Sequence, residues 1–126
     1  MPIKTASAKA KGRALQQYVR DRIMETYPWL REGDVESRSM GASGVDVMLS
    51  PAAREVFPIS VEAKKTKKVP SKAEMDQAKA NAYPDTVAAV VWAGHGQGPS
   101  KAFITFEFNE FLAWWKGQQC RDPNFP

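Results

Sequence analysis

Cysteine, histidine and long apolar runs are nearly absent from this chain of 126 residues. Its one cysteine, Cys120, excludes an internal disulfide framework and a cysteine-based metal cluster. Its one histidine, His95, lies among glycines that lack the lysine of a P-loop, so we expect an exposed loop residue there. No apolar run approaches the ~20 residues needed to span a bilayer, and none follows the basic N-terminus as in a secretory signal. These absences favour a cytoplasmic protein that uses neither a membrane nor a small-molecule cofactor.

Positive charge is plentiful, and it is unevenly placed along the chain, whose net charge is +4. One basic cluster contains Lys4, Lys9, Lys11, Arg13, Arg20 and Arg22, and a second contains Lys64, Lys65, Lys67, Lys68 and Lys72. Two such clusters on a small domain favour a polyanionic partner, most often nucleic acid. Lysines that only keep the surface solvated are the alternative.

The length predicts one domain over residues 1–126, with loose tails at 1–10 and 117–126. Apolar spacing and turn residues predict helices over 8–27, 71–82 and 109–116, and strands over 34–39, 45–49, 59–64, 86–92 and 101–106. Ser50 before Pro51 indicates one helical turn or a tight connection, and Ser71 with Glu74 is typical of a capping box. The order αβββαββα predicts an α/β fold with a central mixed β-sheet flanked by helices.

Two acidic residues and a lysine are placed for chemistry on two consecutive predicted strands. Asp46 begins one strand, Glu62 lies near the end of the next, and Lys64 projects to the same side as Glu62 because side chains alternate along a strand. If the strands pair, the two carboxylates and the backbone carbonyl of Ala63 come within reach of one Mg²⁺, for which Mn²⁺ would substitute. Asp46 as a turn cap, and Glu62 with Lys64 as a solvated ion pair, are the structural alternatives.

These residues resemble the PD-(D/E)XK nuclease superfamily, in which an aspartate precedes Glu-x-Lys on the next strand. Here the motif is "GVD", ending at Asp46, and "EAK" at 62–64. The likeness is closer to archaeal Holliday junction resolvases, with Lys11-Gly12, "RSMGASGVD" at 38–46 and "EAKKTKK" at 62–68. Small phage-encoded nucleases are also similar, since they pair a "KGRxLQQxVRD" helix with "SMGAxGxD". The resemblance spans residues 11 to about 115.

The resemblance implies a restriction-endonuclease-like core that hydrolyses phosphodiester bonds with a divalent metal, in a bacterial or phage-infected cell. Asp46, Glu62 and the Ala63 carbonyl would be metal ligands, and Lys64 would be the catalytic lysine. The resolvases have a first-helix glutamate that contributes to the metal site, and Gln16 stands at that position here. The residues expected to support the site are Gln16, Gln17, Ser39 and Gln77, and those expected to contact DNA are Lys11, Arg13, Ser43, Lys65, Lys67 and Lys68.

The function predicted from these features is a structure-selective DNA endonuclease acting on branched DNA in recombination or repair. A chain of this size offers one active site, so cutting two strands symmetrically requires a homodimer, for which the aromatic segment 103–115 is the candidate interface. One alternative is a catalytically silent nucleic-acid-binding module with the same fold. Another is an accessory protein whose basic patch meets a protein partner and whose DNA affinity is not salt-sensitive.

Overall fold

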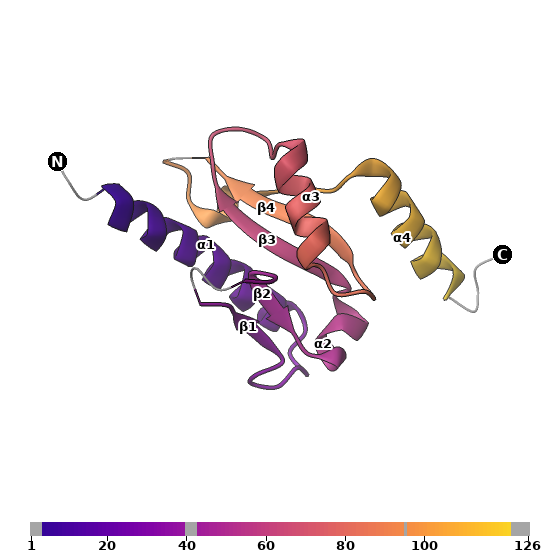
Figure 1. Cartoon of the computed structure of the whole chain (residues 1–126). Helices are drawn as coiled ribbons and strands as arrows, with labels where there is room; N and C mark the ends of the chain where they lie inside the picture. The colour runs from indigo at the N-terminus through magenta and orange to yellow at the C-terminus, as the bar shows by residue number, and fades with distance from the viewer. Residues whose placement is uncertain (1–3, 40–42, 95, 122–126) are drawn as a thin grey trace.

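The computed structural model describes residues 4–39, 43–94 and 96–121 (Figure 1). Its elements in chain order are α1 (Lys4–Thr26), β1 (Val35–Ser37), β2 (Val47–Leu49), α2 (Pro51–Val56), β3 (Ile59–Lys65), α3 (Lys72–Asn81), β4 (Val87–Ala93), the 3-10 turn η1 (Pro99–Lys101), β5 (Phe103–Thr105) and α4 (Phe108–Cys120). None of the helices within these ranges is both long and apolar enough to cross a lipid bilayer.

The central sheet has three strands in the order β3-β4-β5, with β4 parallel to β3 and antiparallel to β5. The predicted α/β class, with a mixed sheet flanked by helices, is therefore confirmed. The pairing considered for the strands of Asp46 and Glu62 does not form among the described residues, because β2 pairs with β1 in a separate antiparallel pair. Strand β2 begins at Val47, so Asp46 lies just before the strand instead of opening it.

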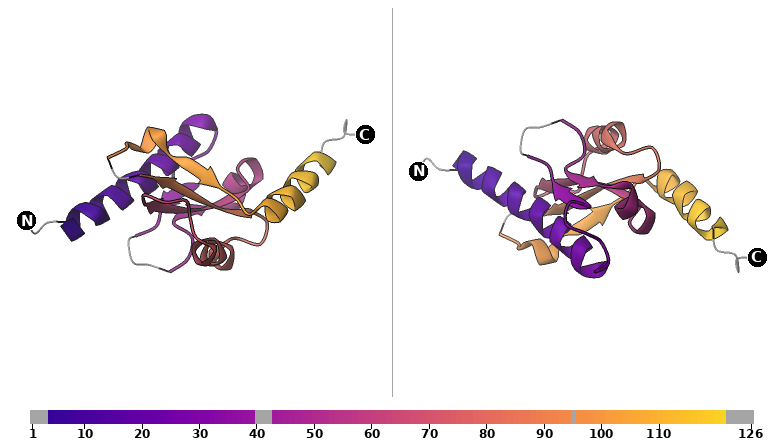
Figure 2. Two further views of the ribbon diagram at one scale, coloured as in Figure 1. Left: turned by 90° about the horizontal axis from the view of Figure 1, so that it is seen from above. Right: turned by 90° about the horizontal axis from the view of Figure 1, so that it is seen from below.

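Helices cover the two faces of the central sheet (Figure 2). On one face, Val19 and Ile23 of α1 pack with Val61 of β3 in a buried cluster that also includes residues of β1 and β2. On the other face, Met75 and Ala78 of α3 pack on β4. Because side chains alternate along β3, its even-numbered residues, Glu62 among them, face α3.

Local signals in the sequence set the starts of two helices. Ser71 Oγ accepts a hydrogen bond from the Glu74 N–H at 3.2 Å, and Glu74 Oε1 accepts one from the Ser71 N–H at 2.9 Å, which confirms the capping box before α3. Ser50 Oγ accepts a bond from the Ala53 N–H at 3.1 Å, so the Ser50–Pro51 signal opens the six-residue helix α2.

The chain ends differ from the sequence-based expectation of loose tails at 1–10 and 117–126. Residues 4–10 belong to α1 and residues 117–120 belong to α4. Apolar periodicity predicts only the packed part of a helix. Here α1 begins before its packed part, and α4 continues past the predicted end.

Candidate metal-binding and nucleic-acid site

The side chains of Asp46 and Glu62 join the segment before β2 to strand β3. The Asp46 carboxylate accepts a hydrogen bond from the Ala63 N–H at 2.8 Å, and the Glu62 carboxylate accepts one from the Asp46 N–H at 3.2 Å. These bonds take the place of a ladder between β2 and β3. The two carboxylates therefore converge as predicted from the sequence, although by a different connection.

The Ala63 backbone carbonyl points to the same edge of β3 as the Asp46 side chain. The Pro58 carbonyl accepts a bond from Val87 at the start of β4, and the Thr66 N–H donates to Ala93 at its end. Even-numbered residues of β3 thus turn their backbone groups toward β4, and odd-numbered ones turn them away. Ala63 belongs to the second set, which its bond to Asp46 confirms.

Gln16 and Arg38 brace the backbone at Asp46. Gln16 is buried in α1, and its Nε2 donates to the Arg38 carbonyl and, at 2.8 Å, to the Asp46 carbonyl. The Arg38 N–H also donates to the Asp46 carbonyl, at 2.7 Å. Arg38 Nε donates to the Val45 carbonyl at 2.6 Å, and its guanidinium lies over Gly44, where a Cβ atom would come within 3.0 Å of it.

Lys64 lies on the α3 side of the sheet with Glu62. Its Nζ is 3.8 Å from Glu74 Oε2, and its charge lowers the pKa of both Asp46 and Glu62, which partly offsets the effect of their burial. The ammonium group therefore lies in the field of the carboxylate pair while it forms a loose ion pair with α3.

Burial, together with the Asp46 charge, raises the pKa of Glu62 to about 7, although the Asp46 N–H, the Asn81 amide and Lys64 act in the opposite direction. Burial also raises the pKa of Asp46, against the Ala63 N–H, Lys64 and Arg38. A buried carboxylate at Glu62 and a partly buried one at Asp46 repel each other, and a divalent cation would relieve this repulsion.

The donor set fits Mg²⁺. In the described ranges, no three His, Cys, Asp or Glu side chains lie close enough together to hold an ion. An ion at this place would therefore have two carboxylates, the Ala63 carbonyl and water as ligands. Mg²⁺ commonly keeps several waters and binds through one or two carboxylates.

Two hollows lined in part by basic side chains lie outside the carboxylate pair. Arg13, Gln17, Ser37, Arg38 and Ser39 line one of them, so the predicted Ser39 and Arg13 come together beside the Asp46 brace. Lys11, Ala14, Lys65, Gly96, Gln97, Gly98 and Pro99 line the other, where Lys65 Nζ donates to the Gln97 carbonyl. The second hollow lies at the carboxyl end of β3, and such strand ends commonly form ligand sites in parallel sheets.

The other predicted site residues that the structure describes form no hydrogen bond with Asp46 or Glu62. Gln17 is exposed and bonds to Asp21 at 3.1 Å, and Gln77 is exposed and bonds to Asn81 at 3.4 Å. The predicted DNA contacts Ser43, Lys67 and Lys68 are exposed. His95 and residues 40–42 of the "SMGASG" turn lie outside the described residues.

Sequence reasoning missed the roles of Arg38, Asn81 and Glu74. Arg38 carried a signal, since it opens the "RSMGASGVD" stretch used for the resemblance. Asn81 and Glu74 reach the site from α3, which packs against the sheet far along the chain from Asp46, and no local pattern reports that packing.

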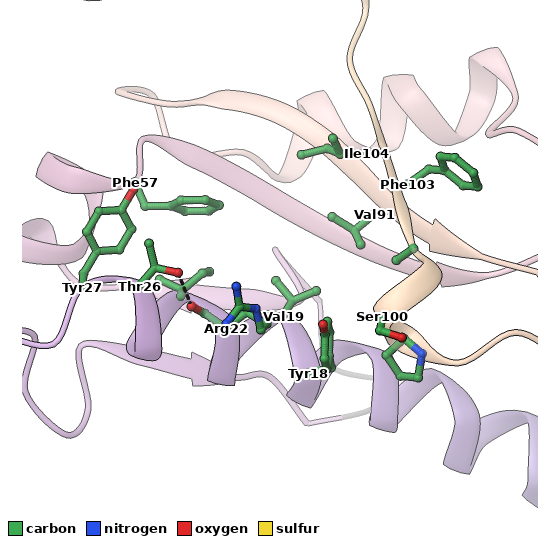
Figure 3. A pocket seen from close by; sticks show the side chains of 13 residues that line it. Tyr18, Val19, Arg22, Thr26, Tyr27, Phe57, Val91, Ser100, Phe103 and Ile104 are labelled. Atoms are coloured by element: carbon green, nitrogen blue, oxygen red, sulfur yellow. Dashed lines mark hydrogen bonds between the residues drawn. The ribbon is translucent and has the colours of Figure 1, made fainter.

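An apolar cleft of about 330 Å³ lies between α1 and the η1–β5 segment (Figure 3). Tyr18, Ile23, Phe57 and Val91 line it, and Arg22 is the one charged residue among the described lining residues. The cleft lies on the α1 face of the sheet, opposite Glu62 and Lys64. It is therefore separate from the carboxylate pair.

Compared with models of protein families, with curated proteins and with solved structures, the chain has no significant match in any of the three. The resemblance to PD-(D/E)XK nucleases is therefore carried by the motif residues alone.

Changing Gln16 to glutamate is expected to destabilise the protein by ~1–3 kcal/mol. A carboxylate cannot donate the two bonds that Gln16 makes, and it would face two carbonyl oxygens in a buried position. Urea denaturation at neutral pH measures the loss. Gln17→Glu, in the next and exposed position of α1, is the control and should change stability by less than ~0.5 kcal/mol. Equal effects of the two substitutions would contradict the brace.

Proposed function

We propose that this protein is a divalent-metal-dependent DNA endonuclease of the PD-(D/E)XK type, with a restriction-endonuclease-like core. The observation that carries the proposal is the convergence of the Asp46 and Glu62 carboxylates with the Ala63 carbonyl at the open edge of β3. Lys64 on the same face as Glu62 supplies a cation beside this donor set.

Asp46, Glu62 and the Ala63 carbonyl would hold Mg²⁺ or Mn²⁺. A bound Mg²⁺ supplies Lewis-acid polarisation of a phosphate oxygen and makes a nearby water more acidic. The Lys64 ammonium would offset the negative charge that develops on the phosphate during hydrolysis. Its pair with Glu74 is partly exposed and 3.8 Å long, so releasing it costs at most ~1 kcal/mol.

The basic residues that line the two hollows support a DNA substrate. Arg13 and Arg38 in one hollow, beside the Asp46 brace, and Lys11 and Lys65 in the other, on the α1 face of the sheet, offer cations to backbone phosphates. Phosphate contacts position DNA without specifying its sequence. We therefore propose that the enzyme selects DNA by structure and prefers branched DNA over a linear duplex.

The direct test is cleavage of four-way, flapped, single-stranded and linear duplex DNA with Mg²⁺, with Mn²⁺ and with a chelator. The wild-type protein should cut branched DNA fastest and cut nothing after chelation. Asp46→Asn should abolish cutting, because it removes one of the two carboxylates. The control is Asp85→Asn, since Asp85 is exposed and pairs with Arg54 instead. Cutting that persists in Asp46→Asn protein would refute the proposed site.

The second candidate function is a catalytically silent DNA-binding module. Two observations favour it: the Gln16 amide is bonded to backbone carbonyls, and Lys64 pairs with Glu74. This alternative predicts DNA binding that weakens steeply with salt, together with no cleavage in either metal.

A further inference from the structure

The apolar cleft beside α1 exists because this helix covers only part of the sheet face on its side. The buried residues Val19 and Ile23 of α1 pack with Val61 of β3 and with residues of β1 and β2. On the same face of the sheet, Val91 of β4 is only partly buried, and its register partner Ile104 of β5 is 46% exposed. Val91 and Ile104 form a wall that faces α1 across the cleft (Figure 3). We refer to this space as the α1–β5 cleft.

The α1–β5 cleft has the size and the lining of a small-molecule site. Its volume is about 330 Å³. Ligand sites occupy ~300–1,000 Å³ and are lined mostly by apolar side chains, with a few polar groups that orient the ligand. Phe57 lies at one end of the cleft and Ser100 of η1 at the other (Figure 3). A ligand between them would remove the apolar wall from water, which favours binding.

The charge of the lining is of one sign among the described residues. Arg22 is a cation, and none of the described lining residues is acidic. Tyr18, one turn before Arg22 on α1, and Ser100, across the cleft, add hydroxyl groups that donate hydrogen bonds. Thr26 also lines the cleft, but its hydroxyl donates to the Arg22 carbonyl at 2.7 Å. The donors that remain suit an acidic group on a ligand.

Arg22 can bind a ligand although it already pairs with Glu25. Its Nη1 donates to Glu25 Oε1 at 2.8 Å, and the two side chains are 57% and 63% exposed. Exposed pairs three residues apart on a helix are weak. A guanidinium group has five N–H donors, so Arg22 can keep Glu25 and still donate to a second anion.

More positive charge adjoins the cleft at η1. Pro99 lines both this cleft and the hollow that contains Lys11 and Lys65. On α1, Lys11, Tyr18 and Arg22 follow the i, i+7, i+11 spacing of one helix face. The electrostatic potential at the η1 end of the cleft is therefore positive, whereas the Phe57 end is apolar.

We propose that the α1–β5 cleft binds a small organic anion with one acidic group and an apolar body, such as a medium-chain carboxylate. The acidic group accepts hydrogen bonds from Arg22 and from the hydroxyls of Tyr18 and Ser100. The apolar body lies along the sheet wall toward Phe57. This site is on the sheet face opposite the carboxylate pair, so it does not depend on the proposed nuclease function.

Isothermal titration calorimetry of the full chain with decanoate, without DNA or metal, tests the site. We expect one molecule bound per chain with a Kd below ~1 mM. Decyltrimethylammonium has an apolar tail of the same length and the opposite charge, so it should bind at least ~10-fold more weakly. Equal affinities for the two probes, or no binding of decanoate, would overturn the proposal.

Two substitutions test whether decanoate binds in the cleft. Arg22→Gln should weaken its binding ~10-fold, because a hydrogen bond to a charged group is lost. The control Arg31→Gln removes the same charge from an exposed position outside the cleft and should bind as the wild type does. Ala102→Trp places an indole in the cleft and should abolish binding while its far-UV circular dichroism is retained.

The two arginine variants decide the question even if the tryptophan variant does not fold, because both arginines are exposed. If Arg22→Gln and Arg31→Gln weaken decanoate binding equally, the probe responds only to the net charge of the protein and the proposal is wrong. Binding of decanoate to folded Ala102→Trp protein with the wild-type affinity would also refute it.

Discussion

Replacing Lys64 by alanine is expected to slow metal-dependent DNA cleavage by at least ~100-fold. Lys64 lies on the Glu62 side of β3, and its charge already acts on both carboxylates. Its ammonium group would stabilise negative charge on the phosphate in the transition state more than in the bound substrate, so the loss should appear in the rate of the chemical step. Single-turnover cleavage of four-way DNA at saturating protein measures that rate.

Lys65→Ala is the matched control for this substitution. Lys65 is the next residue of β3, faces away from Glu62 and is bonded to the Gln97 carbonyl. Its loss should weaken DNA binding, with little change in the single-turnover rate at saturation. If both alanine variants lose only affinity, Lys64 is a phosphate contact and has no part in the chemical step.

Replacing Glu62 by glutamine is expected to stabilise the metal-free protein by up to ~3 kcal/mol at about pH 8. Burial and the Asp46 charge raise the pKa of Glu62 from 4.5 to about 7 in the folded chain. Between these values the folded chain binds more protons than the unfolded one, so stability falls as the pH rises through about 7. A glutamine keeps an oxygen for the Asp46 N–H and removes the buried charge.

Urea denaturation with a chelator, at about pH 5 and about pH 8, measures this effect. Wild type and Glu62→Gln should differ at the higher pH and converge at the lower one. Added Mg²⁺ should stabilise the wild type and leave Glu62→Gln unchanged, because a cation that binds only the folded state adds to its stability. The control is Glu36→Gln, because Glu36 is the exposed residue of β1. A difference that is the same at both pH values would contradict a titrating Glu62.

The sequence by itself determined the features that depend on neighbours along the chain. The capping box of Ser71 and Glu74 placed the start of α3 because a cap is made within four residues. The apolar run before Glu62 and the alternation of a strand placed Glu62 and Lys64 on one face. The order of motif residues from Lys11 to Lys68 predicts a nuclease, and this prediction uses no contact between distant residues.

The tertiary structure alone decided how these pieces meet. The residue pattern of a strand does not show which other strand it pairs with, so the sequence could not predict the separate β1–β2 pair. It also could not predict that the Asp46 side chain bonds to the backbone of β3. In the sequence, Gln16 occupies the position at which the resolvases have a glutamate. In the fold, its side chain donates hydrogen bonds to two backbone carbonyls. Contacts between residues distant in the chain decide such roles, because a donor acts only through the acceptors that folding brings to it.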